Sequence, residues 1–124
     1  MRPPSIEITS HPRFEPQQSQ THRDRYFYSY RICIINRGAE PCQLISRRWL
    51  ITDGNGQKQE VAGAGVVGQQ PILEQGAEFS YTSGLLLETP VGTMQGFYLM
   101  RTHCGREFKT PIPPFLLAVP GAVN

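Results

Sequence analysis

The chain has 124 residues, of which 39% are hydrophobic, and its formal net charge at pH 7 is +2. This length suffices for one domain with its own apolar core, and the small net charge at that apolar fraction argues against a disordered chain. Ten of the twelve cationic residues are arginines, but they are spread along the sequence without a dense basic run, which argues against nucleic acid as a partner.

The cysteine pattern indicates a reducing compartment. Cys33, Cys42 and Cys104 form an odd set without C-x-x-C spacing, and no secretory leader is visible before them. We therefore expect free thiols and a cytoplasmic location. Apolar runs such as residues 85–87 and 115–119 are far shorter than the roughly 20 residues of a membrane-spanning helix, so no membrane association is expected.

Apolar and polar residues alternate with period two through most of the chain, which indicates β-strands. Residues 5–9 predict an edge strand, and a polar loop through His11 and Pro12 to Asp24 should follow it. Residues 25–36 form the clearest strand, because one of its faces carries only aromatic and large aliphatic side chains and should be buried. The side chains on that face are Tyr26, Tyr28, Tyr30, Ile32 and Ile34.

Residues 42–53 predict the next strand. One of its faces carries Ile45, Arg47, Trp49 and Ile51, and the other carries Leu44, Ser46, Arg48 and Leu50. The sequence Asp53-Gly54-Asn55-Gly56 is a strong hairpin signal, because glycine and asparagine tolerate a positive φ. Residues 57–61 should therefore pair back antiparallel.

Four further segments complete the predicted strands and loops. Residues 63–68 form a glycine-rich loop, and residues 77–87 follow as a strand in which Gly84 marks a bulge or a close backbone approach. Residues 94–101 are apolar on both faces, which suits a central strand. The last strand, residues 106–117, contains three prolines and should lie at an edge or bend there.

About seven short strands separated by tight turns, with no sustained helical period, are typical of a sandwich of two antiparallel sheets. We therefore predict an all-β fold in which residues 1–124 form one domain. Such a fold presents loops and sheet edges to partners, and edge pairing would also permit a homodimer.

Gly63, Gly65 and Gly68 match the spacing of the dinucleotide-binding fingerprint G-x-G-x-x-G. The context does not fit, because that motif must open a helix, whereas here a proline soon follows and strand signals come next. A weaker hypothesis is that the loop presents backbone N–H groups to a phosphate, with Arg47 or Arg48 neutralising its charge. The alternative is a plain mobile loop.

The residues contain no recognisable catalytic constellation. There is neither a nucleophile elbow nor an evident Cys–His–Asn arrangement, and of the two aspartates, Asp24 and Asp53, the second is explained by its turn. His103 and Cys104 are adjacent, so in a strand they would point to opposite faces, and no partner pair lies nearby in the sequence. We therefore expect no catalytic residues, no metal site and no cofactor.

Four blocks, taken together and in this order, resemble the bacterial ApaG family. They are QLISRRW at 43–49, GAGVVGQQP at 63–71, FSYTSG at 79–84 and MQGFY at 94–98. The resemblance extends from about Ile6 to Leu117 and implies an immunoglobulin-like or fibronectin type III-like β-sandwich. It also implies an association with cobalt resistance and magnesium efflux, and similar domains are interaction modules in some eukaryotic F-box and polymerase-associated proteins. No catalytic residues come with it, and only the three glycines are carried over, as a suspected phosphate loop.

Three hypotheses for the function follow. In the first, the domain is a noncatalytic binding module whose loops or edge strand dock a protein partner linked to divalent-cation homeostasis. In the second, the loop from Gly63 to Gly68 binds a nucleotide or pyrophosphate, with or without hydrolysis, and Arg47 or Arg48 neutralises the phosphate charge. The third is direct binding of cobalt or magnesium, which predicts a stabilisation that scales with the free metal concentration.

Overall fold

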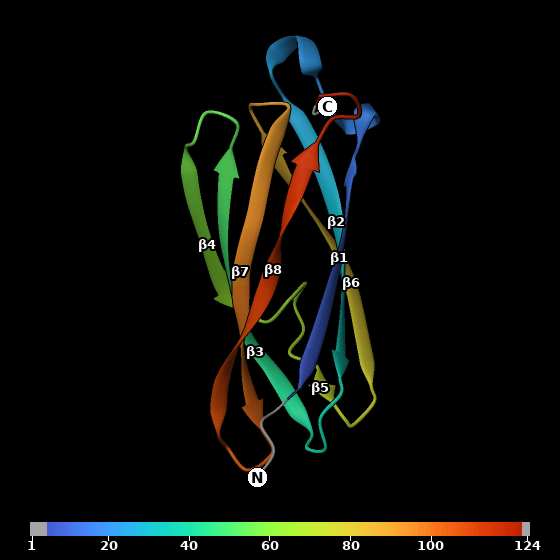
Figure 1. The fold of residues 1–124 in the computed structure, drawn as a ribbon, viewed down its shortest axis with the longest axis vertical. Coiled ribbons are helices and arrows are strands. Elements are labelled where there is room, and N and C mark those ends of the chain that lie inside the picture. Colours follow the sequence, from blue (N-terminus) through green and yellow to red (C-terminus); the bar gives the residue numbers. More distant parts are fainter. Residues whose placement is uncertain (1–4, 123–124) are drawn as a thin grey trace.

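The computed structural model describes residues 5–122, which form two antiparallel β-sheets packed face to face (Figure 1). The first sheet has the strand order β1-β2-β6 and the second has the order β4-β3-β7-β8, with β5 pairing beside the start of β3. The strands are β1 (Ile6–Phe14), β2 (Tyr26–Asn36), β3 (Cys42–Asp53), β4 (Lys58–Ala64), β5 (Ile72–Leu73), β6 (Glu78–Leu87), β7 (Val91–Thr102) and β8 (Glu107–Ala118). Two short 3-10 helices, η1 (Pro16–Gln18) and η2 (Thr21–Arg23), lie between β1 and β2.

This arrangement confirms the predicted all-β sandwich. Three strands face four long ones, as in fibronectin type III-like domains. The described residues form eight strands, where the sequence indicated about seven, because the two-residue β5 was not predicted. Within residues 5–122 no helix is long and apolar enough to cross a membrane.

The apolar face of β2 supplies the centre of the core, as predicted. Tyr28, Ile32 and Ile34 are fully buried, and Tyr30 is nearly so. From the opposite sheet, Trp49 packs edge-on against Tyr30, with their ring centroids 5.6 Å apart. Burying large aromatic side chains from both sheets stabilises the sandwich by roughly 25 cal/mol per Å² of apolar surface removed from water. It also fixes which face of each strand points inward.

The predicted loop at His11 and Pro12 is wrong. β1 continues through both residues to Phe14 and pairs with β2 along its whole length. Pro12 stands opposite Tyr30 in this ladder. A proline is tolerated here because β1 is an edge strand, so one of its sides has no neighbouring strand to receive an N–H donor.

A β-bulge interrupts the predicted alternation in the first half of β3. The register between β3 and β7 shifts between Leu44 and Ser46, where β3 accommodates an extra residue. Leu44 is consequently fully buried, whereas Ile45, which the alternation placed on the same face as Trp49 and Ile51, is only partly buried. Beyond the bulge the prediction is confirmed, because Trp49 and Ile51 are both buried.

Two predictions that depend on glycine have different outcomes. The hairpin turn after β3 is confirmed, since the Asp53 carboxylate accepts the Asn55 N–H at 2.8 Å and Gly56 has a φ of 82°. Gly84 does not mark a bulge, because β6 pairs with β2 without a register shift. It marks a close approach to a side chain, since a Cβ there would lie 2.6 Å from Cζ of Phe27.

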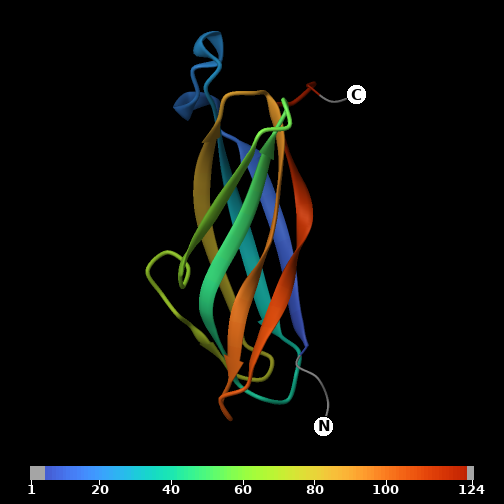
Figure 2. The same cartoon turned by 90° about the vertical axis from the view of Figure 1, so that its left-hand side faces the viewer.

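The remaining strands are confirmed, with β7 in a central position and β8 at an edge. The prediction that residues 63–68 all lie in a loop is wrong for Gly63 and Ala64, because β4 continues through them and pairs with β3. Between β4 and β6 the chain crosses from one sheet to the other, and the crossing segment forms a loop on the side of the sandwich where these two strands lie (Figure 2). This segment is anchored in the core, because Val66 is fully buried and Leu73 is nearly so.

Candidate functional site

The glycine loop, which we define as residues 63–71, contains a tight turn closed by its own backbone. The N–H groups of Val66 and Gln69 each donate to the other residue's carbonyl oxygen, at 2.8 and 2.9 Å. The two residues between them, Val67 and Gly68, have φ values of 42° and 78°. Two successive positive φ values define a type I′ turn, which glycine adopts readily and valine does not.

Gly65 fixes the point at which the loop leaves β4. Its N–H donates to the Ile45 carbonyl oxygen at 2.8 Å, and its φ of 61° favours glycine. A Cβ on this residue would also clash with the Gln69 carbonyl oxygen. The N–H groups of Gly65, Val66 and Gln69 are therefore engaged by backbone carbonyls of the protein itself.

Arg47 lies against the glycine loop and binds its carbonyl groups. Its Nη1 donates to the carbonyl oxygens of Ala64, at 3.0 Å, and Gly65, at 2.8 Å. A Cβ on Gly63 would lie 3.0 Å from Nη2 of Arg47, so the glycine leaves room for the guanidinium. Hydrogen bonds from a charged donor are roughly twice as strong as neutral ones, so these two contacts hold the loop firmly.

Arg48 is separated from the other residues of the suspected phosphate loop. Its Nη2 lies 2.5 Å from Oε2 of Glu60 in an exposed ion pair, whereas the Arg47 guanidinium is bonded to the loop. Gly68 lies in the exposed turn, where a Cβ would meet no neighbouring atom. The structure thus brings Arg47 together with Gly63 and Gly65, and phosphate binding at these residues stays a prediction.

A cluster of tyrosine hydroxyls lies inside the sandwich near Arg47. The hydroxyls of Tyr81 on β6 and Tyr98 on β7 are 2.5 Å apart, so this hydrogen bond links the two sheets. Burial raises the pKa of both phenols and of Tyr30, while the Arg47 charge acts in the opposite direction on all three. The phenols are therefore neutral over the physiological pH range. The sequence predicted that Tyr30 faces inward but contained no signal that the hydroxyls of Tyr81 and Tyr98 meet.

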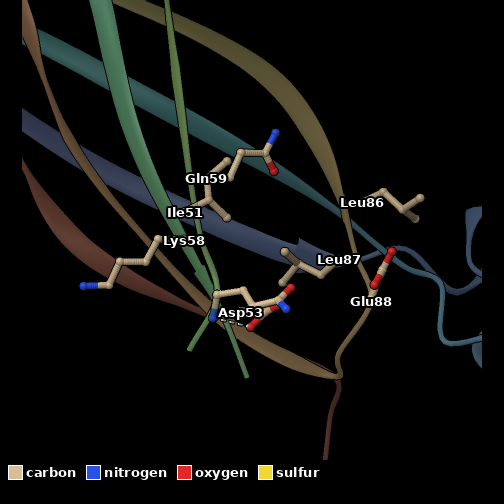
Figure 3. Close-up of a pocket in the computed structure, with 8 residues that line it drawn as sticks. Ile51, Asp53, Lys58, Gln59, Leu86, Leu87 and Glu88 are labelled. Atoms are coloured by element: carbon tan, nitrogen blue, oxygen red, sulfur yellow. Dashed lines mark hydrogen bonds between the residues drawn. The ribbon is translucent and has the colours of Figure 1, made fainter. Parts of the chain in front are cut away.

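A groove of about 220 Å³ opens between β4 and β6, at the opposite end of β4 from the glycine loop (Figure 3). Ile51 and Leu87, which are 7% and 5% exposed, form its floor. Polar and charged side chains, among them Lys58, Gln59 and Glu88, line it further out. The groove therefore offers a small apolar floor with a polar surround.

The four outer strands of the sandwich differ in how their free edges are protected against pairing with another chain. β8 contains three prolines, β1 contains Pro12 and contacts β8, and β4 carries Lys58 and Glu60. Prolines and charged side chains are devices that block strand addition. Within residues 5–122, β6 pairs only with β2 and contains neither proline nor lysine, and its one charged residue, Glu78, is its first. Its side chain Leu86 is 46% exposed and lines the groove.

Another group of polar side chains lies at the end of the sandwich where the loops after β2 and β7 meet. His103 and Cys104 lie in the turn between β7 and β8, so the argument that they would point to opposite faces of a strand does not apply. Glu40, from the loop between β2 and β3, joins them. The expectation of no metal site rested on spacing along the chain, which could not include Glu40.

The strand order and the packing of the two sheets define this chain as a β-sandwich domain of the fibronectin type III-like class. The sequence profile of the ApaG domain matches residues 16–102. The chain belongs to the ApaG family, which confirms the resemblance of the four sequence blocks.

Relatives with the same family name match almost the whole chain. It is 52% identical over 119 residues to Protein ApaG of Aromatoleum aromaticum, covering 96% of this chain and 94% of that protein. It is 50% identical to Protein ApaG of Dechloromonas aromatica, with the same coverage of both chains. A crystal structure of a Bordetella pertussis protein named ApaA superimposes with a TM-score of 0.94 at 47% identity, covering 97% of this chain and 98% of that one. None of these names states a molecular activity.

Proposed function

We propose that this chain is a noncatalytic interaction module that binds an extended segment of a partner protein along the free edge of β6. The observation that carries the proposal is that β6, among the outer strands described, is the one with neither proline nor lysine, and that it lies beside an open groove. An extended peptide can add a strand to such an edge through main-chain hydrogen bonds.

The groove beside this edge indicates what the bound segment should contain. Ile51 and Leu87 on its floor favour an apolar side chain, and the surrounding Lys58 and Glu88 favour polar neighbours. Alternate side chains of an extended strand point the same way, so a segment with apolar and polar residues in alternation fits best. Main-chain pairing would supply affinity, and the groove would supply selectivity.

The nucleotide hypothesis has less geometric support. The N–H groups of Gly65, Val66 and Gln69 are bonded to backbone carbonyls, and Arg47 donates to the loop rather than to an external group. In the present proposal, the link to cobalt resistance and magnesium efflux that the family resemblance implies acts through the bound partner. A reducing cytoplasm would suit the three free thiols.

The test is a selection of extended peptides from a random displayed library, followed by titration of the bound sequences into the ¹⁵N-labelled domain. We expect peptides with alternating apolar and polar residues, and shifts of amide signals along β6. Leu86→Lys should weaken binding at least tenfold, because the charge lies next to the groove and the paired edge. Leu116→Lys on β8 is the matched control, since Leu116 is 48% exposed and Leu86 is 46% exposed.

Three results would overturn the proposal. The library could yield no binder, the shifts could fall outside β6, or the two lysine variants could bind equally well. A parallel titration with ATP, ADP and pyrophosphate, with and without magnesium, tests the nucleotide hypothesis. Shifts confined to Gly63, Gly65 and Gly68 would support that hypothesis instead. Pairing of β6 with β6 of a second copy would appear as a concentration-dependent dimer that Leu86→Lys disrupts.

A further inference from the structure

We propose that Glu40, His103 and Cys104 form a binding site for one divalent cation of the zinc class. Their side chains offer a carboxylate oxygen, an imidazole nitrogen and a thiol sulfur, and these ligand atoms all lie within 4.8 Å of one another. The three residues belong neither to the glycine loop nor to the groove beside β6. The inference is therefore independent of the proposed peptide-binding function.

The backbone holds the two ligand-bearing segments together. The His103 N–H donates to the Pro41 carbonyl oxygen at 3.1 Å, which joins the turn after β7 to the loop before β3. The Glu40 carbonyl oxygen accepts Nδ2 of Asn36 at 2.7 Å, and Asn36 is fully buried. The main chain thus places all three ligands before a metal arrives, so only side-chain rotation has to be fixed on binding.

The distances suit a tetrahedral centre after a small adjustment. Nδ1 of His103 lies 3.8 Å from Oε2 of Glu40 and 4.0 Å from Sγ of Cys104. Zinc bonds of about 2.0 Å to nitrogen or oxygen and about 2.3 Å to sulfur place tetrahedral ligand atoms roughly 3.3–3.6 Å apart. These two pairs must therefore close by about half an ångström, and the Glu40–Cys104 pair, which lies within 4.8 Å, must close further. His103 and Cys104 are exposed and can rotate to do so.

The ligand types select the class of metal. Thiolate and imidazole favour Zn²⁺ over Mg²⁺ and Ca²⁺, which prefer oxygen ligands. Three protein ligands leave the fourth tetrahedral position to water. Arg106 lies two residues after Cys104, so a cation already lies near this end of the sandwich. That charge opposes metal binding.

The test uses the full chain, freed of metal and kept reduced. Zn²⁺ affinity and stoichiometry are measured by competition with a chromophoric chelator, and Cd²⁺ is added separately to detect the ultraviolet charge-transfer band of a metal-bound thiolate. We expect one ion per chain. Cys104→Ser should abolish the Cd²⁺ band although Cys33 and Cys42 remain, and His103→Gln should weaken Zn²⁺ binding at least tenfold.

His22→Gln is the matched control, because His22 is also exposed and lies in η2, away from Glu40 in the sequence. Its Zn²⁺ affinity should equal that of the parent chain. The metal-free melting temperatures of all these variants should also be unchanged, since the substituted side chains are exposed. A Cd²⁺ band that survives Cys104→Ser, equal affinity in His103→Gln and the parent, or one ion per two chains would each overturn the site.

Discussion

Replacement of Arg47 should show that the glycine loop is held from within the protein. Arg47→Met keeps most of the apolar stem but removes the donors to the carbonyl oxygens of Ala64 and Gly65, at 3.0 and 2.8 Å. Hydrogen bonds from charged groups contribute about 1.5–3 kcal/mol each when their partner is left unsatisfied. Because these carbonyls lie near the surface, water replaces part of the loss, and we expect a cost of about 2 kcal/mol.

Arg48→Met is the matched control. Arg48 is the next residue on the same strand, and its exposed ion pair with Glu60 should contribute less than about 1 kcal/mol. The assay is urea and thermal unfolding of both variants, in which a loss of 2 kcal/mol corresponds to a fall of roughly 8 °C in Tm for a chain of this size. Hydrogen exchange at Gly65 should accelerate in Arg47→Met alone. Equal losses in both variants, or unchanged exchange at Gly65, would refute the reasoning.

Three further predictions concern the core. Gly96→Ala should cost about 3 kcal/mol or more in urea unfolding, because its Cβ would clash with the Arg48 carbonyl oxygen, which belongs to a rigid ladder. Tyr98→Phe should lower the free energy of unfolding by about 1–3 kcal/mol, because the Tyr81 hydroxyl is left buried without its partner. Replacing both tyrosines by phenylalanine should lower it no further than replacing one. Burial raises the pKa of Tyr28 from 10.0 to about 12. Ionisation of this group should therefore leave the free energy of unfolding unchanged below pH 10 and lower it above pH 10, by up to about 1.4 kcal/mol per pH unit. Tyr28→Phe should reduce this loss, as measured by melting at several pH values.

Period-two alternation predicted the strands because burial of one face constrains every second residue. The stripe on β2 follows this rule from the partly buried Tyr26 to the fully buried Ile34, although Cys33 on the other face is buried as well. The rule fails where a strand contains an extra residue at a bulge. At the bulge beside Leu44, Leu44 is therefore buried and Ile45 only partly buried, although the alternation placed Ile45 on the face of Trp49. A bulge depends on pairing with β7, which no local pattern reports. The extension of β1 past Pro12 was missed although the edge position was predicted, because Pro12 was interpreted as the end of the strand, whereas an edge strand tolerates it.

The candidate sites were harder to predict than the strands because they depend on contacts between distant segments. Alternation placed Arg47 and Arg48 on opposite faces of one strand, which already argued against both serving one phosphate. The meeting of Glu40 with His103 requires the loop after β2 to lie against the turn after β7, and this follows only from the three-dimensional arrangement. The protected and unprotected edges could be compared only after the strand order was known.

The glycine loop illustrates how a motif can match a phosphate-binding pattern for structural reasons. Gly63 leaves space for the guanidinium of Arg47, Gly65 avoids a clash with the Gln69 carbonyl and adopts a positive φ, and Gly68 supplies the second left-handed residue of the turn. Each glycine thus meets a separate requirement of a loop that crosses between the sheets, and none of these requirements involves an anion. The spacing therefore adds no weight to nucleotide binding, which depends on direct titration. The free edge of β6, by contrast, carries neither proline nor lysine and pairs with no further strand within residues 5–122, and this is why we propose the function there.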